Sequence, residues 1–151
     1  MKAFTFVLLA LVFLSCSNSK KPNEQVISEH PFLIGQWAGT GNFLNQEFDK
    51  EMGPLHIVIS ISNKKINALF NHQELKNVTI QPTNYGFEIQ GKLTNELNSK
   101  LKTGKDKLVI LLVIPEVNQE STNEVDANFH LKNNFNFDYS MKVGGVNLKK
   151  E

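Results

Sequence analysis

Residues 125–132 read Val-Asp-Ala-Asn-Phe-His-Leu-Lys, in which each apolar residue is followed by a polar one. Successive side chains of an extended strand point to opposite faces of the sheet, so this run predicts a strand with one buried face and one solvated face. Residues 135–143 continue the alternation with bulky apolar residues on one face. The glycine pair at 144–145 predicts a bulge or a turn before the last apolar residues.

Earlier parts of the chain repeat this two-residue period. Residues 55–61, 66–70 and 87–93 each place their large apolar side chains on one face, with Val58 as an exception on the polar face. The cluster Gln-Pro-Thr-Asn at 81–84 predicts a turn, and Thr-Gly-Lys-Asp at 103–106 is the strongest hairpin candidate. These runs indicate short strands joined by tight connections.

One strand candidate differs from the others because residues 108–114, Leu-Val-Ile-Leu-Leu-Val-Ile, are apolar on both faces. A strand of this kind needs a cover on its outer side. Another sheet, a short helix or a partner protein would each provide that cover.

Two segments have helical spacing instead. Apolar residues recur at every fourth position in 44–52 and again in 93–101, which suits one face of a helix. Each segment could be a short helix that caps the end of a barrel, and a strand edge or a loop is the alternative.

Eight to ten short antiparallel strands must close on themselves or stack in two layers to hide their edges. The sequence therefore predicts an all-β fold, an antiparallel up-and-down β-barrel of about eight to ten strands. A two-sheet β-sandwich is the alternative, because the two-residue period is common to both.

Residues 32–41 read Phe-Leu-Ile-Gly-Gln-Trp-Ala-Gly-Thr-Gly, and their Gly35-Gln36-Trp37 resembles the Gly-x-Trp that opens the calycin families, above all the lipocalins. The resemblance implies a lipocalin-like barrel whose first strand begins at Trp37, with this ring packed across the closed end. Glycines at 39 and 41 would let the first strand bend. Lipocalins stack an arginine on this tryptophan, but the chain has no arginine. The whole pattern is similar to lipocalin-like β-barrel lipoproteins of Bacteroidetes-type bacteria.

The N-terminal segment predicts export. A charged start is followed by an apolar run over residues 3–14, too short to span a bilayer as a helix. Cys16, the only cysteine, follows Ser15 and resembles the lipobox cysteine that carries the lipid of bacterial lipoproteins, although Phe13 and Leu14 depart from the usual pattern. An ordinary secretory signal is the alternative.

This reading divides the chain into a signal peptide (1–15), a lipidated N-terminus with a polar tether (16–30) and a single barrel domain (31–151). Ser17 follows the cysteine in place of the aspartate that retains some lipoproteins at the inner membrane. We therefore expect an exported protein, anchored by its N-terminal lipid to the cell envelope, in the outer membrane of a two-membrane cell.

The composition excludes several functions. Without residues 1–15 the chain keeps 15 basic and 15 acidic residues, and this balance argues against nucleic-acid binding. The four histidines lack metal-ligand spacing, and no nucleophile motif or phosphate loop occurs. We therefore expect a non-catalytic protein without a cofactor or a metal.

Two functional hypotheses remain. The first is binding of a small apolar ligand inside the barrel; its candidate residues are Trp37, Phe70, Phe87, Phe129, Phe137 and Tyr139. The second is interaction with another envelope protein, as an accessory module with a fully packed barrel and no ligand. The doubly apolar run 108–114 motivates this second hypothesis.

Overall fold

The computed structural model describes residues 22–114, 121–133 and 140–151. The chain forms, in order, α1 (Pro22–Glu29), the 3-10 helix η1 (Pro31–Leu33), β1 (Gly35–Phe43), α2 (Gln46–Met52), β2 (Leu55–Ile61), β3 (Ile66–Phe70), β4 (Gln73–Glu74), β5 (Lys76–Thr83), β6 (Gly86–Lys92), α3 (Asn95–Leu101), β7 (Lys107–Val113), β8 (Glu124–Lys132) and β9 (Met141–Lys150).

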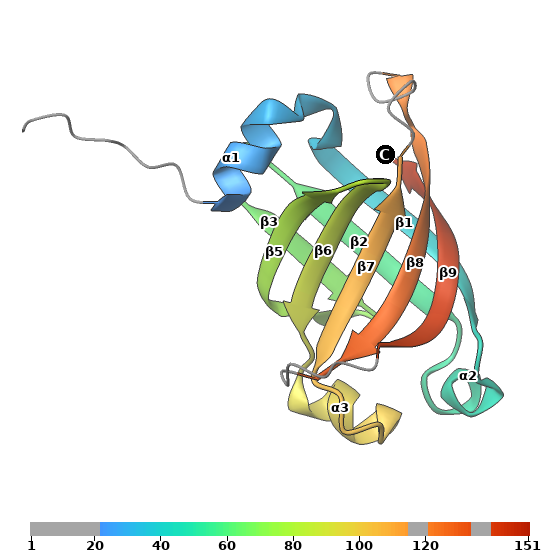
Figure 1. The fold of residues 1–151 in the computed structure, drawn as a ribbon. Coiled ribbons are helices and arrows are strands. Elements are labelled where there is room, and N and C mark those ends of the chain that lie inside the picture. Colours follow the sequence, from blue (N-terminus) through green and yellow to red (C-terminus); the bar gives the residue numbers. More distant parts are fainter. Residues whose placement is uncertain (1–21, 115–120, 134–139) are drawn as a thin grey trace, which may run out of the picture.

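The nine strands make one antiparallel sheet in the order β4-β3-β2-β1-β9-β8-β7-β6-β5. Figure 1 shows that the sheet curls until β3 and β5 approach each other, which gives a nearly closed barrel. The predicted all-β antiparallel barrel of about eight to ten strands is therefore confirmed, in place of the two-sheet sandwich. The helices lie at the ends of the barrel: α1 and η1 where β1 begins, and α2 and α3 at the opposite end (Figure 1).

Alternation places the apolar residues inside, as predicted. In β2 every second residue from Leu55 to Ile61 is buried, and in β8 the buried positions are 125, 127, 129 and 131. The predicted bulge near the glycine pair is present in β9, because Phe129 pairs with Gly144 while His130 pairs with Lys142, which leaves one extra residue on β9. Residues 134–139 of the predicted strand lie outside the described residues.

One turn prediction is displaced and one hairpin prediction is wrong. Strand β5 continues through Gln81, Pro82 and Thr83, so that only residues 84–85 form the turn. Proline is compatible with this position because β5 is an edge strand. The segment 103–106 does not join two strands; it is the loop between α3 and β7.

Both segments with helical spacing are helices. Asn45 caps α2 by accepting a hydrogen bond from the backbone N–H of Glu47. Thr94 caps α3, because its side-chain oxygen accepts a hydrogen bond from the backbone N–H of Leu97. The apolar side chains of the second segment, at 93, 97 and 101, are buried, whereas Leu44 precedes α2 and is exposed.

The boundary between the polar tether and the folded domain needs correction. Residues 22–29, which were assigned to the tether, form helix α1, and its Ile27 is fully buried in the core. The folded part thus includes Pro22. Two adjacent apolar residues, Val26 and Ile27, in a polar sequence were too weak a signal for this helix. None of the described helices has the length and apolar character needed to cross a bilayer.

Candidate functional site

The interior of the barrel holds four of the six aromatic residues expected to contact a ligand. Trp37, Phe70, Phe87 and Phe129 belong to one hydrophobic core, and each is at most 2% accessible. A void that could hold a ligand would leave accessible area on the side chains around it, so none of these four borders such a void. Their geometry is that of a packed core.

Three predicted functional residues cannot be placed. Phe137, Tyr139 and the proposed lipidation residue Cys16 lie outside the described residues. The sites assigned to them stay predictions.

The end of the barrel where β1 begins is closed around Trp37. Its indole Nε1 donates a 2.8 Å hydrogen bond to the carbonyl oxygen of Leu33 in η1. Lys150, from the last strand, lies over the ring with its Nζ 5.3 Å from the centroid, and this Nζ donates to the carbonyl oxygen of Phe32 at 2.7 Å. A lysine therefore stacks on the tryptophan in a chain without arginine.

The link from α1 to β1 completes this closure. The His30 ring packs edge-on against Phe87 with centroids 4.8 Å apart, and Phe32 packs against the same ring at 5.9 Å. Phe87, one of the candidate ligand residues, thus connects the N-terminal segment to β6.

The gap in the barrel lies between β3 and β5, which no strand pairing joins in the described residues. Here the side chain of Asn23 in α1 bonds the edge of β5 twice: it donates to the carbonyl oxygen of Val78 at 3.0 Å and accepts from the N–H of Ile80 at 3.0 Å. On the other side, Leu75 N–H donates to Ala68 O at 2.9 Å. These bonds satisfy backbone N–H and C=O groups at the sheet edge that could otherwise pair with a strand of another molecule.

A hollow of about 750 Å³ lies on the outside of this gap. Seven of its nine lining residues have polar side chains, and the nine come from β3, β4, β5, positions beside these strands and the cap of α3: Lys65, Asn67, Gln73, Glu74, Leu75, Lys76, Asn77, Val78 and Thr94. None of the predicted ligand residues lines it, so sequence reasoning did not identify this hollow; its lining depends on which strands meet at the gap.

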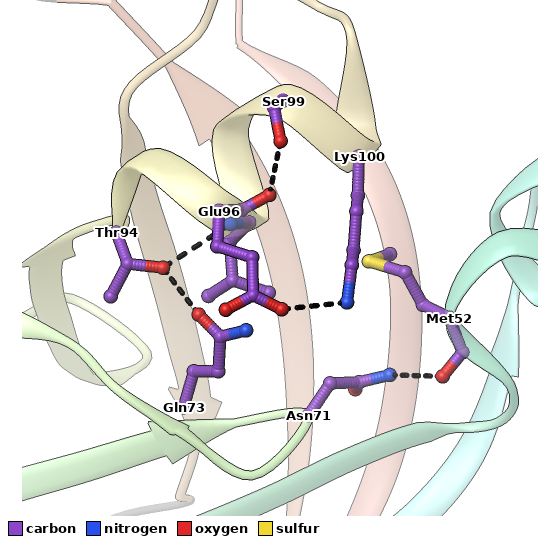
Figure 2. A network of polar contacts seen from close by, with 8 residues as sticks. Met52, Asn71, Gln73, Thr94, Glu96, Ser99 and Lys100 are labelled. Carbon is purple, nitrogen blue, oxygen red and sulfur yellow. Dashed lines mark hydrogen bonds and ion pairs between the residues drawn. The ribbon is translucent and has the colours of Figure 1, made fainter.

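At the end of the barrel where α2 and α3 lie, a network of polar contacts connects these helices to the β3–β4 segment (Figure 2). Thr94 Oγ1 is hydrogen-bonded to Gln73 Oε1, and Lys100 Nζ donates to Glu96 Oε1 at 2.8 Å. The bond from Lys100 and its positive charge lower the pKa of the exposed Glu96. Asn71 Nδ2 donates to the carbonyl oxygen of Met52, which joins the β3–β4 turn to α2. These bonds hold neighbouring segments together, and we assign them a structural role.

The outer face of β7 is apolar, as the sequence predicted. Val109, Leu111 and Val113, here called the β7 stripe, point away from the core, whereas the residues between them are buried inside. Val109 is flanked by Gln90 and His130 on the neighbouring strands and is only 1% accessible, but Val113 is 41% accessible. No described helix or strand covers this face, which is open in Figure 1.

No group of three or more His, Cys, Asp or Glu residues that could hold a metal ion occurs within the described ranges. His56 and His72 stack with centroids 4.5 Å apart. His130 lies on the outer face, where partial burial and then the charges of Lys142 and Lys132 lower its pKa.

These features define a nearly closed antiparallel β-barrel, compatible with a lipocalin-like fold, whose described hollows are on its outside. The chain matches no family model, no curated protein and no solved structure.

Proposed function

We propose that this chain is a non-catalytic protein of the cell envelope that acts through the outside of a packed barrel, as an interaction or accessory module. The observation that carries the proposal is the contrast between the two faces of β7. Its inner residues are buried among the aromatic side chains of the core, while Leu111 and Val113 of the apolar β7 stripe are accessible and not covered by any described helix or strand.

Exposed apolar residues on a solvated sheet face are characteristic of contact surfaces. Leu111 and Val113 are the accessible part of the stripe, and Glu88 and Asn128, which flank Leu111 in register, supply a polar rim. An apolar centre with a polar surround is the usual composition of a protein interface. The proposed partner is therefore another envelope protein.

The test is a pull-down from envelope extracts with Leu111→Glu and Val113→Glu variants of the full chain. Val58→Glu is the matched control, because Val58 is also an apolar residue on the outward face of a strand, on β2. We expect wild type and Val58→Glu to retain the same partner and the two β7 variants to lose it. Equal retention by all four proteins would refute the role of the stripe.

Export and anchorage are part of the same proposal. The apolar leader and the lone Cys16 support attachment through a thioether-linked lipid, since two acyl chains anchor a protein stably. Cys16→Ser should move the protein from the membrane fraction to the soluble fraction. Retention of this variant in the membrane fraction would contradict lipidation.

Binding of a small apolar ligand inside the barrel is the second candidate function. Its support is the interior itself, because no polar or charged residue is buried within the described part of the chain. A ligand would have to displace packed side chains such as Phe129, and for this reason we rank it below the outer-surface function.

A further inference from the structure

Four lysines lie directly opposite one another on four adjacent strands. Lys76 of β5 pairs with Lys92 of β6, Lys92 pairs with Lys107 of β7, and Lys107 pairs with Lys132 of β8. The residues beside them in sequence are buried leucines, at 75, 93, 108 and 131, so the four lysines point outward. With strands about 4.8 Å apart, this lysine row extends over about 14 Å.

The lysine row is a concentration of charge that little in the protein offsets. Of these four lysines, only Lys92 forms an ion pair within the described ranges, to Asp106 at 3.8 Å. A further lysine, Lys142 of β9, pairs with His130, two residues along β8 from Lys132. Like charges directly opposite each other destabilise a sheet, so such a row costs stability unless an external anion neutralises it.

Apart from Asp106, which pairs with Lys92, the carboxylates on the outward faces of β6 and β8 lie away from the row. Glu88 and Asp126 lie on the outward faces of β6 and β8, four and six residues from the lysines of their own strands. The face is therefore polarised, with its basic end next to α3 and its acidic groups nearer the end where β1 begins (Figure 1).

The position of α1 indicates which anion the row would meet. The side chain of Asn23, the second residue of α1, bonds β5 at Val78, two residues from Lys76 in sequence. Six residue steps separate Pro22 from Cys16, a reach of at most about 20 Å. A lipid on Cys16 would keep the row close to the bilayer surface.

We propose that the lysine row is a docking surface for anionic phospholipid headgroups, which orients the barrel with its α3 end toward the membrane. The proposal builds on the anchorage at Cys16 but concerns a separate surface. Lys107 and Val113 lie at opposite ends of β7, about 20 Å apart, so a barrel docked in this way keeps the exposed end of the β7 stripe accessible to a partner.

The experiment measures binding of the full chain carrying Cys16→Ser to phosphatidylcholine vesicles with and without phosphatidylglycerol. The row variant combines Lys92→Gln, Lys107→Gln and Lys132→Gln. The control combines Lys64→Gln, Lys65→Gln and Lys149→Gln, which removes the same charge elsewhere. Each set contains one ion-paired lysine, Lys92 or Lys149, and two lysines without an ion pair among the described residues.

We expect salt-sensitive binding that requires phosphatidylglycerol. Each lysine near an anionic surface raises the binding affinity about fivefold. The row variant, which lacks three lysines, should therefore bind about a hundredfold more weakly, while the affinity of the control should change little. Equal losses in both variants would show that net charge suffices and would overturn the proposal. Tight binding to polyphosphate without binding to either vesicle would overturn it in favour of an anionic polymer.

Thermal unfolding of the two variants supplies an independent readout. Because the row variant loses like-charge repulsion, we expect its midpoint to rise above that of the control. A row variant that is folded but less stable than the control would contradict the repulsion on which the argument depends. Cell fractionation of Cys16→Ser tests the anchor separately, so failure of the row and failure of the anchor give different results.

Discussion

The ammonium nitrogen of Lys150 lies 5.3 Å from the centre of the Trp37 ring, so the last strand closes over the first residues of the barrel. The same nitrogen donates to the carbonyl oxygen of Phe32 at 2.7 Å, and Glu151 N–H donates to Gln36 O at 2.9 Å. Gly35 makes the approach possible, since a Cβ built there would lie 2.7 Å from Lys150 Cε. These contacts join the two ends of the folded chain at one end of the barrel.

Lys150→Met should therefore lower the free energy of unfolding by about 1–2 kcal/mol, because it removes a cation–π contact and a charged hydrogen bond. Lys150→Arg keeps a cation over the ring and should lose less than half of that amount. Urea unfolding followed by Trp37 emission measures both variants. A Met variant as stable as wild type would show that the contact contributes nothing.

Gly39→Ala tests the close approach of β1 and β9. A Cβ at this position would lie 2.5 Å from the carbonyl oxygen of Asn147 and 2.5 Å from Val146 Cγ1, so one of the strands must shift. We expect a loss of about 1–3 kcal/mol in unfolding free energy, the usual cost of overpacking. Gly145→Ala in β9 is the control, because its nearest neighbour would be at 3.5 Å. Equal effects of the two substitutions would contradict this account.

Asn23→Ala tests the protection of the β5 edge. The variant loses two hydrogen bonds to β5 and should be about 1–2 kcal/mol less stable, with increased aggregation on heating because edge groups become available. Gln25→Ala is the control in the same helix, since Gln25 is exposed and its side chain bonds Glu29 of the same helix and not β5. Light scattering during thermal unfolding should separate the two variants; identical traces would argue against an edge-capping role.

His130 makes stability depend on pH. Burial, and then Lys142 and Lys132, lower its pKa in the folded state, so below the ordinary histidine pKa of about 6.5 the unfolded chain binds the proton more readily. Stability should fall as the pH decreases from about 6.5 toward the folded-state value, and His130→Gln should reduce this fall. Ring-proton NMR measures the pKa directly, and Lys142→Gln should raise it in part. A His130 pKa in the folded wild type that is higher than in the unfolded chain would refute burial and the two lysines as the cause of the shift.

The period of the hydrophobic residues was sufficient to predict an all-β antiparallel fold, because each strand needs only its own alternation to bury one face. The choice of a barrel over a sandwich depended on the resemblance of Gly35-Gln36-Trp37 to the calycin opening. Leu93, Leu97 and Leu101 likewise predicted α3 from local spacing. The turn errors have a physical origin. Pro82 favours turns in general, but it also fits an edge strand, and the sequence does not show which strand lies at the edge.

The surface features depend on register between strands, which a single sequence does not contain. Lys76, Lys92, Lys107 and Lys132 are separated by 15 to 25 residues in sequence and meet only through pairing. The two bonds of Asn23 to β5 likewise connect residues more than 50 positions apart. The interior aromatics were predicted correctly as buried, but periodicity does not distinguish a side chain that fills a core from one that lines a cavity.

Binding of an apolar fluorescent fatty acid to the full chain, followed by quenching of the single tryptophan, Trp37, tests most directly whether the barrel interior is a packed core. Phe129→Ala serves as the positive control, because the cavity it creates can admit an apolar ligand, and Phe129→Leu replaces it if that variant does not fold. The account predicts no saturable binding by wild type and measurable binding by the cavity variant. Stoichiometric binding by wild type, with a change in Trp37 emission, would contradict the packed core and would support ligand binding inside the barrel instead.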